Sequence, residues 1–358
     1  MGQIGQGFQR WFSYVPQTAH GTKNASPTSA MVPLRGGSIF QPNPITQRRA
    51  DAINALAPKS FYYTVPKIVP WQASFYVTNP TTAHNTLRAF LRAVYGRETL
   101  VAGPPLTKTF DVFDPLVDGA TDTGTVLYGR VMTLHEQVDD STGAKISSDE
   151  VQDAIVEELA VTWEPDQPVR FDVSGMASDY QDDLVDVTPV YPDGQLYTFA
   201  NVRDVAVNAG LRIGTANPPV AADNVIFSRA TLRIRNEIRY TPFLGNGTTK
   251  QVRIPTRNGP MQITLEVVMD VESATASLYD SSDAKAHFVD GTGVNCRFLT
   301  YIDANNIMEF KSTGATAAGF IESSQQAAQN EGAMQYTFGY RVAPAALGDT
   351  SLILTTVS

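Results

Sequence analysis

The sequence predicts a mainly β protein made of two tandem sheet units, each with a flanking α-helix. Several segments alternate apolar and polar residues with the two-residue period of a half-buried strand. One such segment occurs twice: residues 65–80 (VPKIVPWQASFYVTNP) are similar to residues 254–270 (IPTRNGPMQITLEVVMD) when Pro70 is aligned with Pro260. A helix-like segment follows each copy, so the order of elements is repeated as well.

The totals allow this duplication and exclude several functional classes. A chain of 358 residues is long enough for two domains that each bury a core. The formal net charge of -9 disfavours general binding to nucleic-acid phosphates. The one cysteine, Cys296, excludes an internal disulfide, and its alternation with Val294 and Phe298 predicts a core position.

The first 50 residues predict an arm rather than a domain. They are rich in Gly, Pro, Gln, Ser and Thr, with an aromatic cluster at Phe8, Trp11, Phe12 and Tyr14. Exposed aromatic side chains are costly, so we expect this arm to dock on its own fold or on a neighbouring subunit. No apolar run has the length of a signal peptide or a membrane helix, which predicts a soluble, unsecreted chain without a membrane partner.

In the first half, the repeated segment predicts a strand over residues 65–78, and the next apolar stripe predicts a helix over residues 81–96. Further strands are expected over residues 127–140 and 155–163. The turn 164–168 then leads to a returning strand at residues 169–173. A helix from Ser148 to Leu159 is an alternative, because Ser-Asp-Glu is a helix-start pattern.

In the second half, residues 179–222 predict a connection with one or two short strands. Residues 226–243 predict a strand with an apolar face and an arginine face, followed by the second copy of the repeated strand. A weaker helix is expected within residues 271–291, with Leu278 and Phe288 facing inward. A hairpin should turn at residues 303–306, and a late strand is expected over residues 334–342.

No residue pattern indicates a catalytic, metal or nucleotide site. The four histidines are far apart and lack metal-ligand spacing, and no phosphate-binding loop or nucleophile elbow is present, so no cofactor is predicted. Acidic runs at residues 139–140 and 182–186 could supply a carboxylate pair for glycoside hydrolysis. Such runs are more typical of solvated loops, so the sequence favours a protein that is not an enzyme.

Assembly explains the duplication. Strand edges that remain open pair with other chains, and a ring of subunits that joins its sheets into one barrel removes every edge. A chain with two sheet units contributes two positions to such a ring, so fewer chains close it. The repeated segment then marks two copies of the unit of the ring.

Several stretches also carry a family resemblance. QTAHGTKNASPTSAMVPLRGGSIF, LRAFLRAVYG, IFSRATLRIRNEIRY, RNGPMQITLEVVMDV and SLYDSSDAKAHFVDGTGVNCRFLTYID resemble the major tail tube proteins of long-tailed bacteriophages, in a two-domain form. The resemblance implies two tandem β-sandwich or β-barrel domains of the tail-tube type, each with a flanking α-helix. Such chains form trimeric, pseudo-hexameric rings that stack around a channel for double-stranded DNA. It also implies tape-measure and tail-terminator proteins as partners, DNA that passes without specific binding, and a virion tail assembled in the cytoplasm of a host bacterium.

This interpretation assigns residues to regions. The expected regions are an arm with first strands (1–50), a first tube domain (51–185), a linker with short strands (186–224), a second tube domain (225–345) and a C-terminal strand or tail (346–358). Alternation makes the following residues candidates for facing the channel: Gln72, Ser74, Tyr76, Gln262, Thr264 and Glu266. Candidates for contacts between subunits or rings are Phe8, Trp11, Phe12, Arg233, Arg235 and Arg239.

The arginine face favours ion pairs with acids across a subunit boundary, and the arm and the apolar C-terminal residues 351–358 are expected to reach between rings. A different class is open as well. A two-domain adhesin or baseplate module that binds carbohydrate or a receptor would display clusters of Trp or Tyr beside loop acids.

Overall fold

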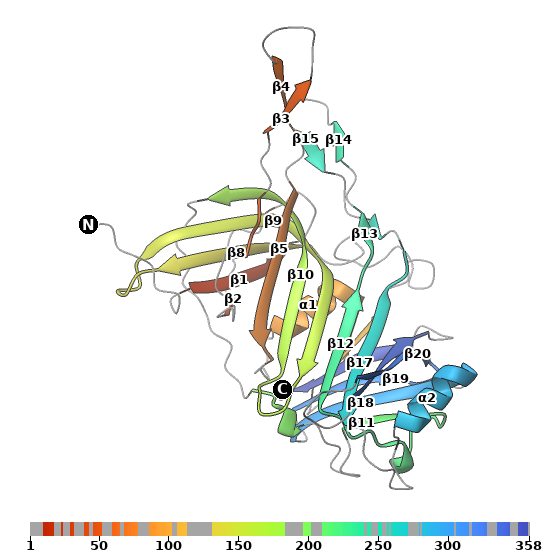
Figure 1. The fold of residues 1–358 in the computed structure, drawn as a ribbon. Coiled ribbons are helices and arrows are strands. Elements are labelled where there is room, and N and C mark those ends of the chain that lie inside the picture. The colour runs from red at the N-terminus through yellow and green to blue at the C-terminus, as the bar shows by residue number, and fades with distance from the viewer. Residues whose placement is uncertain are drawn as a thin grey trace.

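The mainly β fold class is confirmed by the computed structural model (Figure 1). The structure describes residues 10–17, 23, 29–31, 39–42, 46–51, 59–64, 68–77, 86–101, 106–112, 131–182, 196–201, 210–239, 242–244, 250–252, 256–257, 259–270, 279, 281–303, 306–314, 317–327, 335–343 and 350–356. The elements of the first half are β1 (Arg10–Pro16), β2 (Ser29–Met31), β3 (Thr46–Asp51), β4 (Lys59–Thr64), β5 (Ile68–Tyr76), α1 (Thr86–Tyr95), β6 (Gly96–Val101), β7 (Leu106–Val112), β8 (Met132–Asp139), β9 (Lys145–Trp163) and β10 (Arg170–Asp182). Those that follow are η2 (Phe199–Asn201), β11 (Leu211–Gly214), η3 (Ala221–Asp223), β12 (Arg229–Arg235), β13 (Ile238–Arg239), β14 (Pro242–Leu244), β15 (Lys250–Val252), β16 (Thr256–Arg257), β17 (Gln262–Asp270), α2 (Ser281–Asp290), β18 (Gly293–Asp303), β19 (Asn306–Ser312), β20 (Gly319–Ala327), β21 (Gln335–Val342) and β22 (Thr350–Thr356).

The two copies of the repeated segment are strands of one sheet. β5 pairs with β10, and the antiparallel order continues through β9, β12, β17, β21 and β20. We call these seven strands the long sheet; its central strands run side by side in Figure 1. Three strands separate β5 from β17, so both strand predictions for the repeat are confirmed.

β9 is longer than the sequence indicated, and it excludes the alternative helix. Its 19 residues pair with β8, β10 and β12 over successive stretches. The helix considered from Ser148 to Leu159 was therefore wrong. Hydrogen bonds to three neighbouring strands outweigh the local helix-start pattern, which supplies at most one cap.

One face of the long sheet forms the core of the first half together with α1. Phe90 of α1 is fully buried, and its ring centroid lies 6.4 Å from that of Phe75 and 5.9 Å from that of Phe171. The helix prediction for residues 81–96 is confirmed in a shorter form, Thr86–Tyr95. The helix closes the apolar side of the sheet and leaves the other side uncovered by it (Figure 1).

A second group of strands covers the core in the order β18, β19, β22, β7 and β6, with β11 beside β18. Trp163 of the long sheet joins the two layers: its Nε1 donates to Thr300 Oγ1 at 3.0 Å, and its ring centroid lies 4.4 Å from that of Phe298. β22 pairs with β19 of the second half and β7 of the first. The C-terminal residues expected to reach between rings are thus a strand within their own chain. The predicted hairpin β18–β19 is confirmed.

α2 confirms a helix within residues 271–291 but corrects its orientation. Ala284 is fully buried, and the His287 Nδ1 lies 3.2 Å from the Tyr279 hydroxyl, so the inward face lies between these two helix positions. Phe288, expected to face inward, is 42% exposed at the margin of that face. A helix with so few apolar residues does not define its buried side by pattern alone. Leu278 lies outside the described residues.

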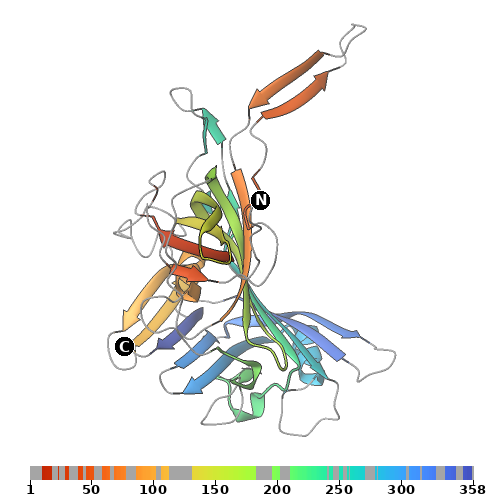
Figure 2. The same ribbon diagram turned by 90° about the vertical axis from the view of Figure 1, so that its left-hand side faces the viewer.

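Two hairpins, β3–β4 and β14–β15, project from the same end of the molecule (Figures 1 and 2). Each hairpin precedes a copy of the repeated strand in the chain, and each copy precedes a helix. The repeat thus covers a hairpin, a strand and a helix. The long sheet and one cluster of buried side chains run through both halves. The division into two tube domains stays a prediction.

Candidate functional site

The candidate site is the face of the long sheet opposite α1, which we call the polar face. Residues directly opposite each other in antiparallel strands point to the same face. Ser74 lies opposite Asp172, and the row continues through Ala160, Arg233, Thr264 and Arg341. The polar face comprises this row and its two neighbours: Gln72, Ser74, Tyr76, Glu158, Ala160, Thr162, Arg170, Asp172, Ser174, Thr231, Arg233, Arg235, Gln262, Thr264, Glu266, Gly339 and Arg341.

All six residues predicted to face a channel lie on this polar face, three on β5 and three on β17. Their shared face follows from the register of the three strands between them, which the sequence repeat alone did not reveal. On the opposite face the alternating positions are buried; on β17 these are Ile263, Leu265, Val267 and Met269. Whether the polar face lines a channel stays a prediction.

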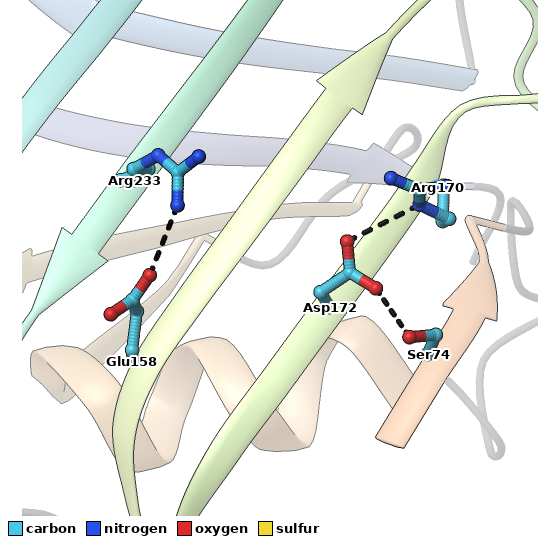
Figure 3. Close-up of polar contacts among 5 residues, drawn as sticks. All are labelled: Ser74, Glu158, Arg170, Asp172 and Arg233. Atoms are coloured by element: carbon cyan, nitrogen blue, oxygen red, sulfur yellow. Dashed lines mark hydrogen bonds and ion pairs between the residues drawn. The ribbon is translucent and has the colours of Figure 1, made fainter. Parts of the chain in front are cut away.

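Ion pairs and hydrogen bonds join the first strands of the polar face (Figure 3). Arg233 Nη1 of β12 lies 3.3 Å from Glu158 Oε1 of β9. On β10, Arg170 Nε lies 3.2 Å from Asp172 Oδ2. Asp172 also accepts a hydrogen bond from the Ser74 hydroxyl of β5. These contacts hold neighbouring side chains across β5, β10, β9 and β12.

Two further ion pairs lie on the strands beyond. Arg229 Nη2 of β12 lies 3.3 Å from Glu266 Oε1 of β17, and Arg341 Nη1 of β21 lies 3.2 Å from Glu322 Oε2 of β20. All four pairs join acids and arginines of one chain. Each is half-exposed, so each contributes at most about 1 kcal/mol to stability, but together they neutralise most of the positive charge of this surface.

The structure gives Arg233 an acid partner within its own chain, and a contact of Arg233 across a subunit boundary stays a prediction. The sequence suggested an acid across a subunit boundary, whereas Glu158 belongs to the same chain. The register explains this, because β9 and β12 come from different halves of the chain and are adjacent in the sheet. Arg235 is exposed, with no carboxylate within 4 Å among the described residues. The Arg239 side chain and Phe8 lie outside the described part of the chain.

Both ends of the long sheet offer incomplete edges. β5 has β10 as its only partner strand in the described chain, and on its other side Phe40 forms a single antiparallel bridge with Trp71. Gln41 N–H donates to the Pro70 carbonyl at 2.9 Å, and Gln72 N–H donates to the Ile39 carbonyl at 3.1 Å. β20 pairs with β21 along its length but with β18 only at residues 319–320.

The described part of the N-terminal arm docks on its own fold. β1 pairs with β8, and Phe12 is fully buried, with its ring centroid 5.4 Å from that of Phe75. Trp11 is half-buried on the same strand. Of the two alternatives for the arm, docking on the same chain therefore holds for Phe12, and a contact between rings stays a prediction for Trp11.

Glu136 on β8 connects the arm to the edge of β5. Its carboxylate is buried, forms an ion pair with Arg10 of β1 and accepts a hydrogen bond from Ile39 N–H at 3.1 Å. Burial raises the pKa of Glu136 above its ordinary value of 4.5, although Arg10 opposes the shift. One carboxylate thus fixes both β1 and the segment beside β5. No sequence pattern indicated this role, since Glu136 and Ile39 are far apart in the chain.

Other ionisable groups act structurally. Asp140 Oδ1 accepts hydrogen bonds from the Thr142 hydroxyl at 2.6 Å and from Ala144 N–H at 2.9 Å, which hold its pKa below the usual range. This carboxylate stabilises the β8–β9 turn. Burial raises the pKa of the Cys296 thiol, as expected of a core residue. The described residues contain no group of three or more His, Cys, Asp or Glu side chains that could hold a metal ion. Nor do they include a helix long and apolar enough to cross a membrane.

The comparisons with known proteins give no family. No family model and no curated protein matches the chain. Among solved structures, it is similar to a chain of the tail of an empty gene transfer agent particle, at 14% identity and a TM-score of 0.27, covering 41% of this chain and 96% of that one. A chain of the virion of a native gene transfer agent particle matches at 13% identity and a TM-score of 0.25, with the same coverage. TM-scores of this size do not establish a shared fold.

Proposed function

We propose that the protein is a structural subunit of a phage-type tail tube, a non-enzymatic protein that assembles with itself into closed rings. In this proposal three copies form a pseudo-hexameric ring, and rings stack around a channel for double-stranded DNA. The tube lies in the virion tail and is assembled in the host bacterial cytoplasm. Tape-measure and tail-terminator proteins are further partners.

The observation that carries the proposal is a long sheet with one apolar face, one polar face and an incomplete edge at each end. Unpaired backbone groups at strand edges recruit other strands. If the edge at β5 meets the edge at β20 of the next copy, one kind of interface satisfies both. Such a head-to-tail contact closes into a ring when the rotation between copies fits.

The charges of the polar face support its use as a channel wall. Unpaired arginines would bind phosphates and slow the passage of DNA. Of the four arginines of the polar face, all but Arg235 are already held by described carboxylates 3.2–3.3 Å away. Apart from Arg235, the described wall consists of paired charges and neutral polar side chains, which offer DNA few fixed binding points.

An adhesin or baseplate module is less well supported. Carbohydrate sites commonly use exposed aromatic side chains, but the chain has three tryptophans, of which Trp71 and Trp163 are buried and Trp11 is half-buried. Among the described side chains no tryptophan is exposed and Tyr76 is the one exposed tyrosine, so they display no cluster of exposed Trp or Tyr. The tube is therefore the function that we propose.

Negative-stain electron microscopy of the purified protein tests the proposal, with sedimentation as a second measurement. We expect rings or stacked tubes with a central channel. The proposal fails if the protein stays monomeric at high concentration, over a range of salt and in the presence of tail-assembly partners.

A further inference from the structure

We infer that β20 of one copy pairs in antiparallel orientation with the Ile39–Pro42 segment of a second copy, and that this contact reproduces the junction between β9 and β12 inside the chain. The inference rests on the proposed ring assembly and names the strands that form its interface. Three features carry it: the neighbours of β9, the directions of the strands, and the attachment of the Ile39–Pro42 segment.

β9 and β20 occupy equivalent places. Each is two strands away from a copy of the repeat, beyond β10 in one half and beyond β21 in the other. The edge of β9 that faces away from β10 has two neighbours in succession, β8 along residues 145–154 and β12 along residues 158–163. The corresponding edge of β20 has β18 at residues 319–320 and, among the described strands, no neighbour along residues 321–327. Within the described part of the chain, no strand therefore takes beside β20 the place that β12 takes beside β9.

The strand directions select the partner. Neighbours alternate in direction along all seven strands of the long sheet, so its two end strands, β5 and β20, run the same way. Direct contact between β20 and β5 of the next copy would therefore be parallel. The Ile39–Pro42 segment runs antiparallel to β5, as the bridge between Phe40 and Trp71 shows. As an eighth strand beside β5, the segment lets antiparallel pairing continue from one copy to the next. The first half of the chain then supplies the segment, β5, β10 and β9, and the second half supplies β12, β17, β21 and β20.

Burial and hydrogen bonds hold the Ile39–Pro42 segment beside β5. Ile39 and Phe40 are buried, and backbone hydrogen bonds join residues 39 and 41 to β5. The Ile39 N–H group also donates a hydrogen bond to Glu136 of β8. In contrast, Gln41 is exposed, as are Ser323 and Gln325 on β20. Both proposed partners thus present side chains that a cross-linking reagent can reach.

Cross-linking between two single-site variants tests the contact. Gln41→Cys protein is mixed with Gln325→Cys protein, assembled, and treated with a short bis-maleimide. We expect a covalent dimer from the mixture and none from either variant alone. Ile146→Cys, at an exposed position near the β8–β9 turn, replaces Gln325→Cys in the matched control and should give no dimer. The native Cys296 is fully buried, so the parent protein supplies the background.

The outcomes separate this inference from the proposed function. If the mixture forms rings but gives no dimer above the Ile146→Cys control, the inference is overturned and ring assembly stands. If the parent protein forms no rings under any condition, the proposed function fails, and the inference fails with it.

Proline substitutions give a second test that does not depend on the cysteine variants. Consecutive strand residues direct their N–H groups to opposite sides, so either Ser323→Pro or Ser324→Pro removes a donor from the open edge. We expect that variant to keep the melting temperature of the parent and lose ring formation. Undiminished rings in both variants would overturn the inference.

Discussion

β5 and β17 are copies of one sequence pattern, yet they occupy different positions in the same sheet. Each follows a projecting hairpin, precedes a helix and buries alternate residues against the core. β17 lies between two full strands, β12 and β21, whereas β5 has β10 on one side and the Ile39–Pro42 segment on the other. The same alternation therefore serves as a central strand and as a strand near an edge, and the neighbours decide which.

The largest effects are expected from equivalent core positions of the two copies. Phe75→Ala should cost about 3–5 kcal/mol and Leu265→Ala about 2–5 kcal/mol in the free energy of unfolding, because both side chains are buried. Chemical denaturation measures both. Phe75→Ala should also expose the β1 region to protease, since Phe12 packs on Phe75.

Leu265→Ala serves as the control for that second effect, because Leu265 lies in the second half of the chain, away from β1. Equal protease resistance of β1 in the two variants would show that docking of the arm does not depend on Phe75. That result would remove one difference between the two copies.

A somewhat smaller effect is expected at Glu136. Glu136→Ala leaves the Arg10 guanidinium and the Ile39 N–H group without their carboxylate, at a cost of about 3 kcal/mol. Hydrogen exchange should show faster exchange of the Gln41 and Gln72 amides, which join the segment to β5. Amides of β17 should be unchanged, since their partners are complete strands. Equal loss of protection in β17 would contradict a local role for Glu136.

The pH dependence of this variant has a definite sign. Because burial raises the pKa of Glu136, the stability linked to its protonation is present below its ordinary pKa of 4.5 and is lost as the pH rises through the raised value in the folded protein. The difference in unfolding free energy between the parent and Glu136→Ala should thus shrink as the pH rises. A difference that grows with pH would show that the ion pair with Arg10 outweighs desolvation.

Alanine substitutions at two glycines on strands next to the repeated strands should differ in stability cost, with the larger cost in the first half of the chain. A Cβ on Gly175 of β10 would lie 1.8 Å from the Ile155 carbonyl oxygen, so Gly175→Ala must move backbone and should cost about 1–3 kcal/mol. A Cβ on Gly339 of β21 would lie 2.6 Å from the Ser323 hydroxyl, which can rotate away. Gly339→Ala should cost less than about 0.5 kcal/mol. Similar costs in urea denaturation would contradict this distinction.

The sequence predicted the positions of strands and helices better than it predicted which of them lie side by side. Alternation located β5, β17 and the hairpin β18–β19, because burial of one sheet face imposes a local period. It located β12 as well, but the strand expected over residues 226–243 ends at Arg235, and residues 238–239 belong to a separate two-stranded sheet. It failed where tertiary contacts decide. The alternative helix from Ser148 to Leu159 is part of β9. Phe288 of α2 was expected to face inward but is exposed, and the prediction failed because the weak apolar pattern of that helix does not mark its buried side.

The candidate site was predicted in its residues but not in its arrangement. Alternation selected Ser74 and Thr264, and only the register of the strands between them places both in one row. The intrachain pair of Arg233 with Glu158 also depends on that register. Sheet order joins segments far apart in the chain, and local pattern carries no information about it. The incomplete edges of β5 and β20 also follow from sheet order, so local pattern could not predict them.

The smallest effects are expected on the polar face, where two arginines of β12 form a matched pair. Arg233 and Arg235 are both exposed, but only Arg233 has a described carboxylate partner, Glu158. Arg233→Gln should cost about 0.2–1 kcal/mol, and Arg235→Gln should be close to neutral. The cost of Arg233→Gln should fall in high salt, which screens exposed charges, and should vanish in a Glu158→Gln background. If Arg235→Gln costs as much as Arg233→Gln in both backgrounds, the ion pair between Arg233 and Glu158 adds nothing to stability. The charges of this face would then not be held by contacts within the chain.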